Sequence, residues 1–175
     1  MAAPARLRLR ANDAEDIQVL SAVLQDALVP LADMAYQTRE RRFVMVANRF
    51  CWEQNGVERG VPQAEASSPD GEAGNGNDAR FDEPDDSLLF ERVNCGVRFD
   101  KVTRVRARNM DLKAKDQILN LLSIQAEPKA VTLVFSGGGE VRLDVATIAC
   151  HLEDIGEPWP TRWRPAHDPG DTPAT

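Results

Sequence analysis

The sequence predicts an α+β fold in which a bent antiparallel sheet is closed by a single C-terminal helix. Two observations in its last third support this prediction. Residues 130–136 and 140–145 are rich in β-branched side chains and flank three consecutive glycines, which is typical of a hairpin. The segment that follows places Ile148, Leu152 and Ile155 on one stripe at helical spacing. We therefore expect two strands joined by a tight turn, and then one amphipathic helix.

A second helix is predicted near the N-terminus by a capping signal and an apolar periodicity. Asn12 or Asp13 can serve as its N-cap, and Glu15 stands three residues after Asn12, which is the spacing of a capping box. The apolar residues that follow recur at steps of three and four and form one face: Ile17, Leu20, Val23, Leu24, Ala27 and Leu28. We expect this helix to extend from Asp13 to Leu28 and to end before Pro30.

Five further segments have the alternating or apolar pattern of strands. These five predicted strands are 31–37, 41–53, 93–99, 102–108 and 121–127. A short alternating segment, 6–10, precedes the helix and is not counted among them. With the hairpin, the sheet has about seven strands, joined mostly by short links. A small bent sheet or partial barrel that ends in one helix is similar to the pleckstrin-homology-like plan, to which the N-terminal helix is an addition.

The strand pattern is interrupted by a long acidic segment. Residues 55–87 are almost entirely Gly, Pro, Ser, Asn, Asp, Glu and Ala, so they cannot bury enough apolar surface to offset the entropy of ordering them. Because the strands on both sides need partners, we expect a disordered loop within a single domain of residues 1–163. A domain boundary is the alternative. The Pro-rich residues 164–175 are expected to form a flexible tail.

Composition limits the class of protein and its location. Of the 175 residues, 42% are hydrophobic and 28% are charged, as in an ordinary globular protein. The net charge of −7 argues against nucleic acid or an anionic membrane as the main partner. No segment has the roughly 20 apolar residues of a membrane span, and the first residues lack the apolar core of a signal peptide. Cys51, Cys95 and Cys150 are widely spaced, so we expect a reducing compartment, the cytoplasm.

No motif predicts a metal, a cofactor or a catalytic residue. The only histidines, His151 and His167, are far apart, and no Cys-x-x-Cys or His-x-x-x-His spacing occurs. Cys95 alternates with apolar residues, so we expect it to be buried rather than reactive. The glycines in 136–140 lead into a strand and not into a helix, so a hairpin turn explains them better than a phosphate-binding loop.

The one local concentration of charge is basic. Residues 92–115 contain eight basic and two acidic residues. Arginines at alternate positions of a strand share one face, and their guanidinium groups suit phosphates and carboxylates. The candidate contacts for an anionic ligand or a protein partner are Arg98, Lys101, Arg104, Arg106 and Arg108. A solvated face, an edge strand protected by its charge, and contact with the acidic loop are the alternatives.

Four segments, 13–28, 40–53, 96–111 and 141–167, resemble a bacterial family of unknown function that occurs mainly in alphaproteobacteria. The resemblance implies a bacterial cytoplasmic protein and brings no activity, cofactor or catalytic residue. The basic stretch, set in an acidic chain, leads us to expect a non-enzymatic binding or adaptor module that uses these residues. An enzyme whose site is assembled from distant residues and a homo-oligomeric structural protein are the alternatives.

Overall fold

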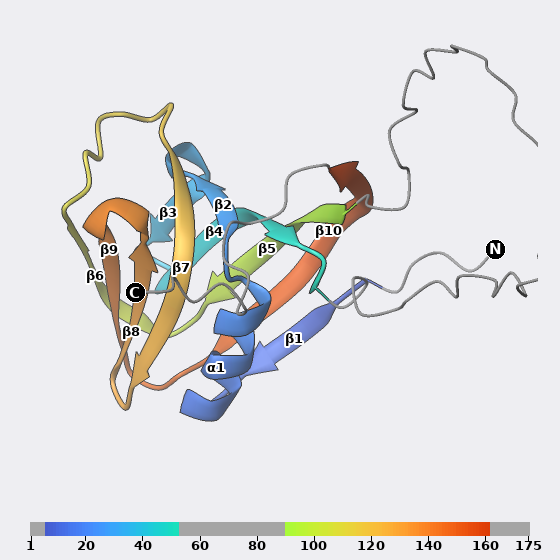
Figure 1. The fold of residues 1–175 in the computed structure, drawn as a ribbon. Coiled ribbons are helices and arrows are strands. Elements are labelled where there is room, and N and C mark those ends of the chain that lie inside the picture. Colours follow the sequence, from blue (N-terminus) through green and yellow to red (C-terminus); the bar gives the residue numbers. More distant parts are fainter. Residues whose placement is uncertain (1–5, 53–89, 162–175) are drawn as a thin grey trace, which may run out of the picture.

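The computed structural model describes residues 6–52 and 90–161, which build one antiparallel sheet and one α-helix (Figure 1). The expected disordered loop 55–87 and the tail 164–175 lie outside the described residues. The sheet curves strongly, so that β6, β8 and β9 lie on one side of the molecule and β1, β5 and β10 on the other.

The strands of the described part are arranged in the order β1-β10-β5-β4-β2-β7-β8-β9-β6, and β3 pairs with another part of β4. Their bounds are β1 Arg8–Ala11, β2 Ala27–Pro30, β3 Met34–Gln37, β4 Arg42–Phe50, β5 Phe90–Phe99, β6 Val102–Arg108, β7 Ile118–Glu127, β8 Ala130–Phe135, β9 Glu140–Val145 and β10 Cys150–Thr161. The helix is α1, Ala14–Val23, and two 3-10 turns are η1, Leu31–Asp33, and η4, Ser136–Gly138.

One apolar core lies between the inner face of the sheet and α1. The helix packs against β7 and β1 and contributes Ile17 and Leu20, which are buried together with Leu24 just after it. These side chains meet apolar residues of the strands, such as Phe43 and Leu133. The sheet therefore has one buried face, while its other face points away from the helix.

The N-terminal helix begins as predicted but is shorter. Asp13 is its N-cap: Oδ1 accepts a hydrogen bond from the backbone N–H of Asp16 at 2.9 Å, and Asp16 Oδ2 accepts one from the N–H of Asn12 at 2.8 Å. The two bonds resemble a capping box, but Asp16 takes the role expected of Glu15 and accepts from Asn12, the residue before the N-cap. The first two turns of the helix therefore have the predicted acidic cap at their start and the predicted apolar face, which is buried.

The helix does not continue to Leu28 as predicted. It ends at Val23, and Asp26 has a left-handed φ of 60° that turns the chain into β2. In β2, Ala27 and Val29 are buried while Leu28 points to the exposed side. The apolar residues in this part of the sequence fit both the helical period of about 3.6 residues and the strand period of two. Pairing with β4 and β7 favours the strand.

The prediction of a C-terminal helix is wrong, and so is the prediction of a pleckstrin-homology-like fold, because the segment forms a strand. Most of the segment 146–156 that was expected to be helical belongs to β10, where Cys150 and Leu152 point into the core and Ile155 points out. There are ten described strands instead of about seven, because β1, β2 and β10 were not counted. The strand pattern of β10 was hidden because its third inward position holds a charged residue, Asp154.

Asp154 is buried because it forms an ion pair inside the sheet. Arg49 of β4, 1% exposed, donates from Nε to Asp154 Oδ1 and from Nη2 to Oδ2, both at 2.8 Å. The N–H of Leu7 donates to Oδ2 at 2.9 Å, and the N–H of Asp154 donates to the carbonyl of Leu7 at 3.0 Å. The carboxylate therefore connects β4, β10 and the segment that leads into β1.

The predicted glycine hairpin is confirmed by β8 and β9. Gly137 and Gly138 have φ values of 78° and 81°, which glycine adopts without the steric cost of a Cβ. The N–H of Phe135 donates to the carbonyl of Gly139 at 2.8 Å and closes the turn. The turn leads from strand to strand, as expected.

We expect Asp154→Asn to lower the free energy of unfolding by about 3 kcal/mol, because the buried guanidinium of Arg49 loses its carboxylate. Urea denaturation measures this loss. The matched control is Glu153→Gln at the preceding position. The ion pair of Glu153 with Arg8 is mostly exposed and should contribute little to the free energy of unfolding. Equal losses in the two variants would contradict the role given to the buried pair.

Candidate functional site

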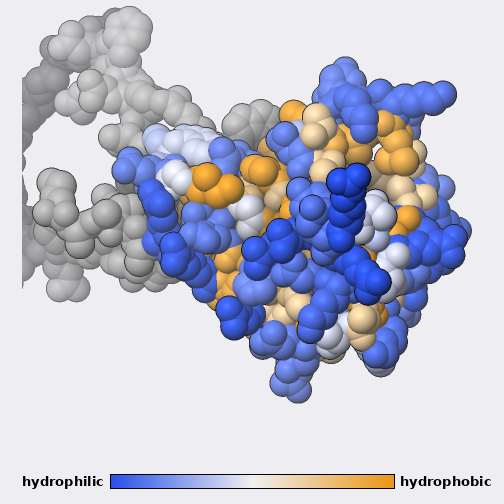
Figure 2. Space-filling view, turned by 180° about the vertical axis from the view of Figure 1, so that it is seen from behind, coloured by the Kyte–Doolittle hydropathy of each residue, from blue (hydrophilic) through white to orange (hydrophobic). Residues whose placement is uncertain are grey.

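The outer face, meaning the side of β1, β10, β5, β4 and β2 that points away from α1, carries the candidate site. Strand register sets its side chains in rows across the strands. One row, from β4 to β1, consists of Val44, Arg98, His151 and Arg10. Figure 2 views the molecule from the side opposite α1, and shows groups of apolar atoms between polar side chains.

Basic side chains from four strands meet at one end of this face in what we call the cationic cluster, composed of Arg10, Arg42, Arg98 and His151 around Asp100. Arg42 Nε lies 2.8 Å from Asp100 Oδ1, and Arg98 Nε lies 3.1 Å from Oδ2. Nη2 of Arg98 lies 3.3 Å from Nδ1 of His151. Arg10 is the register neighbour of His151 on β1.

The charges of the cluster shift the protonation of its two titratable groups. Burial alone would raise the pKa of Asp100, but a hydrogen bond from Arg42 and the charge of Arg98 outweigh this and lower it. The pKa of His151 is lowered, first by burial and then by the charges of Arg98 and Arg10. Near neutral pH the cluster therefore combines a carboxylate with a neutral imidazole, whose Nδ1 accepts from Arg98.

The cluster has more hydrogen-bond donors than acceptors. Three guanidinium groups carry five N–H groups each, and Asp100 supplies the one carboxylate among them. Within the described part of the chain Arg10 forms no ion pair, and the side chain of Arg98 is 43% exposed. An arginine cluster of net charge +2 with unused donors at the surface can bind a carboxylate or a phosphate.

Exposed apolar side chains continue the outer face beyond the cluster. Val46 pairs with Gly96, and Ile155 reaches over Gly96, where its Cδ1 lies 3.2 Å from the position of a Cβ. Leu28 is in the row of Ile155, linked through Asn94 and Asn48. Leu28, Val46 and Ile155 are 36%, 37% and 51% exposed. Exposed apolar residues next to arginines are typical of protein interaction surfaces.

The residues predicted as contacts do not form one group. Arg98 belongs to the cationic cluster, whereas Lys101 lies in the turn after β5 with a φ of 58°. Arg104, Arg106 and Arg108 lie on β6, the last strand in the sheet order, and share a face as expected. The basic stretch of the sequence is thus divided between two parts of the sheet.

Acidic side chains of the neighbouring strands partly neutralise the β6 arginines. Arg106 Nη2 donates to both oxygens of Asp144 on β9, at 2.9 and 3.0 Å. Arg142, also on β9, lies between Asp144 and Glu127 and pairs with both. The hydrogen bond from Arg106 lowers the pKa of Asp144. This ladder of exposed charges agrees with a solvated sheet face.

The sequence analysis did not include Arg10, Arg42 and His151 among the candidate contacts, because they are distant in sequence from the basic stretch 92–115. Arg10 belongs to the alternating segment 6–10, and Arg42 follows three other charged residues at a turn. His151 was expected on a helix. The alternation of 6–10 was the one signal in the sequence that could have placed Arg10 on a sheet face.

The cysteines are buried and do not suit a nucleophile. Cys95 is buried as expected, and burial raises the pKa of its thiol to about 12. Burial also raises the pKa of Cys150. A buried thiol with a raised pKa is almost fully protonated near pH 7, so it is a weak nucleophile. Among the described residues, no group of three or more His, Cys, Asp and Glu could hold a metal ion.

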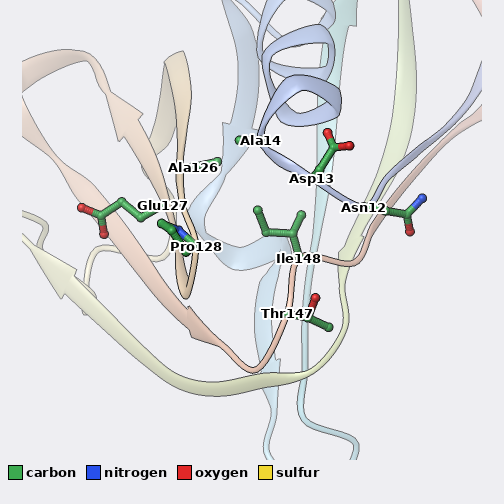
Figure 3. Close-up of a pocket in the computed structure, with 8 residues that line it drawn as sticks. All are labelled: Asn12, Asp13, Ala14, Ala126, Glu127, Pro128, Thr147 and Ile148. Carbon is green, nitrogen blue, oxygen red and sulfur yellow. The ribbon is translucent and has the colours of Figure 1, made fainter.

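A hollow of about 280 Å³ lies at the N-terminus of α1 (Figure 3). Ile148 points into it, while Asn12 and Glu127 point away. Asp13 at its rim is engaged as the N-cap of the helix. Without convergent polar groups the hollow offers no chemistry comparable to the cationic cluster. None of the described helices is long and apolar enough to span a membrane.

A family model described as "Protein of unknown function (DUF2948)" matches residues 7–167. This match confirms the resemblance to a family of unknown function that the sequence predicts. No curated protein and no solved structure matches the chain.

We expect NMR titration to give His151 a pKa below that of a free histidine, and Arg98→Gln to raise it, because the guanidinium next to Nδ1 disfavours protonation. His167→Gln leaves His151 as the single histidine to be observed. Arg104→Gln on β6 is the control and should leave the pKa unchanged. A His151 pKa that does not respond to Arg98 would contradict the geometry of the cluster.

Proposed function

Because the chain belongs to the DUF2948 family, whose description gives no activity, we propose a function from the outer face: a non-catalytic binding module that holds an acidic protein partner. The observation that carries this proposal is the surplus of guanidinium donors in the cationic cluster. Arg98 and Arg10 are the principal contacts, and Arg42 supports them through Asp100.

The apolar part of the outer face favours a protein over a small anion. A phosphate or carboxylate needs only the arginines, whereas Val46 and Ile155 gain from burial against a partner. A partner with acidic residues beside apolar ones complements the charge at one end and the apolar surface in the middle. Charge pairs steer such a partner and set its register, while apolar burial holds it.

The negative charge of the chain is concentrated outside the strands that form the outer face. Residues 53–89 contain 10 acidic and 2 basic residues, a net charge of −8, so the other residues together carry +1 from a total of −7. The outer face therefore belongs to a part of the chain that is not acidic.

We expect Arg10→Gln/Arg98→Gln to weaken capture of the partner at least about tenfold, because charge-assisted hydrogen bonds contribute roughly 1.5–3 kcal/mol each. Purified protein is used to capture partners from native cell lysate, and each captured protein is quantified by mass spectrometry against the unmodified chain. The matched control is Arg104→Gln/Arg108→Gln, which removes the same charge from β6.

The control separates the two basic surfaces. A partner that is lost only in the β6 variant would move the binding surface to the arginines predicted from sequence. A partner that both variants retain would contradict binding through arginines, and sedimentation would show whether that partner is a second copy of the chain.

A further inference from the structure

Three buried side-chain atoms of the described residues have no hydrogen-bond partner, and their residues lie on or beside three adjoining strands, β4, β2 and β7: Asp26 Oδ2, Trp52 Nε1 and Asn120 Oδ1. Most buried polar atoms in native proteins have such a partner, and an unsatisfied one costs roughly 1–3 kcal/mol. Together with Asn48 and Arg92 these residues make up what we call the polar corner. Unsatisfied atoms on adjoining strands can form hydrogen bonds with a bound molecule.

Phe50 and Leu28 bring the polar corner together. The ring of Trp52 lies 4.5 Å from that of Phe50, and the guanidinium of Arg92 lies over the same ring at 5.7 Å. Nη1 of Arg92 donates to Asn48 Oδ1 at 3.1 Å. Leu28 of β2 pairs with Asn48 on one side and with Asn120 on the other.

Asp26 and Arg92 bring opposite charges to the corner, and Asp26 Oδ2 has no hydrogen-bond partner. Asp26 is 3% exposed and Arg92 is 9% exposed. Burial lowers the pKa of Arg92, and the nearby Asp26 carboxylate opposes this, so the two groups are within electrostatic range. Within the described residues only Nη1 of Arg92 donates hydrogen bonds, both to Asn48. The guanidinium and the carboxylate thus both have unused capacity.

The hydrogen-bond donors and acceptors that have no partner determine which kind of molecule the polar corner can bind. Asp26 Oδ2 and Asn120 Oδ1 are acceptors, and the indole N–H of Trp52 and the remaining N–H groups of Arg92 are donors. The charges of Asp26 and Arg92 sum to zero, so a ligand of no net charge leaves no buried charge uncompensated.

We propose that the polar corner binds a small zwitterion with the ammonium and carboxylate groups of an amino acid. Arg92 and Trp52 bind the carboxylate, and Asp26 and Asn120 bind the ammonium group. The site lies at the end of the outer face opposite the cationic cluster, and it does not depend on the proposed function. Ordered water molecules are the alternative occupant.

Glycine is the smallest probe with both charged groups. Titration of ¹⁵N-labelled full-length protein is followed at the indole N–H of Trp52, assigned from Trp52→Phe, and at the Nε–H of Arg92. We expect glycine, or an equimolar mixture of the twenty amino acids, to shift both resonances to saturation. Acetate and methylammonium, which each carry one of the two groups, should bind at least about tenfold more weakly.

Asp26→Asn tests the assignment of the acceptor. Asn tolerates the left-handed backbone at this position, so the variant keeps the turn into β2, but loss of the negative charge near the buried Arg92 should lower the thermal stability without ligand. Amino-acid binding should fall at least about tenfold, because a charge-assisted hydrogen bond is lost. The exposed Asp33→Asn is the control for the charge change, and Arg10→Gln/Arg98→Gln should bind as the unmodified protein does.

Two results would overturn the proposal. Absence of a saturable shift with glycine and with the mixture would leave ordered water as the occupant of the corner. Saturable binding that Asp26→Asn does not weaken would place the zwitterion elsewhere. Loss of partner capture in the Arg10/Arg98 variant with amino-acid binding intact keeps this test separate from that of the proposed function.

Discussion

The buried ion pair between Arg49 and Asp154 is the interaction on which the register of β4, β5 and β10, and with it the outer face, depends. The two residues lie on strands that are not neighbours, with β5 between them, and their bidentate geometry holds the register of all three. A shift of β10 by one residue would turn Asp154 to the surface, bury Ile155 and deprive a buried guanidinium of its carboxylate. The same register places His151 beside Arg98, so the outer face depends on an interaction in the interior.

This interaction also explains where the sequence misled. Strands whose inward positions are all apolar, such as β8 and β9, were found because their period of two is unbroken. In β10 the inward Asp154 broke that period, and Ile148, Leu152 and Ile155 suggested a helix. Its partner is more than a hundred residues away, so local periodicity could not identify a buried carboxylate. Similarly, nothing in the residues around Asp26 distinguished one more helical turn from a left-handed turn into β2.

The candidate site was only partly predictable for the same reason. Arg98 was found because basic residues are concentrated around it in sequence, but Arg10 and His151 reach it through strand pairing. The β6 stripe had the right alternation, yet the sequence did not reveal that Asp144 of β9 pairs with Arg106. Whether a charge is neutralised depends on the neighbouring strand, and strand order is the property that local patterns specify least.

The outer face joins the cationic cluster and the polar corner, which differ in character. Arg98 in the cationic cluster and Arg92 in the polar corner lie six residues apart on β5, which is about 20 Å along an extended strand. Between them the face presents Ile155 and Val46. A protein that contacts both ends must cover these apolar side chains, and occupation of the polar corner would then alter the surface that it meets. Since β5 is paired on both sides and carries both arginines, a rigid strand sets the spacing between the two sites.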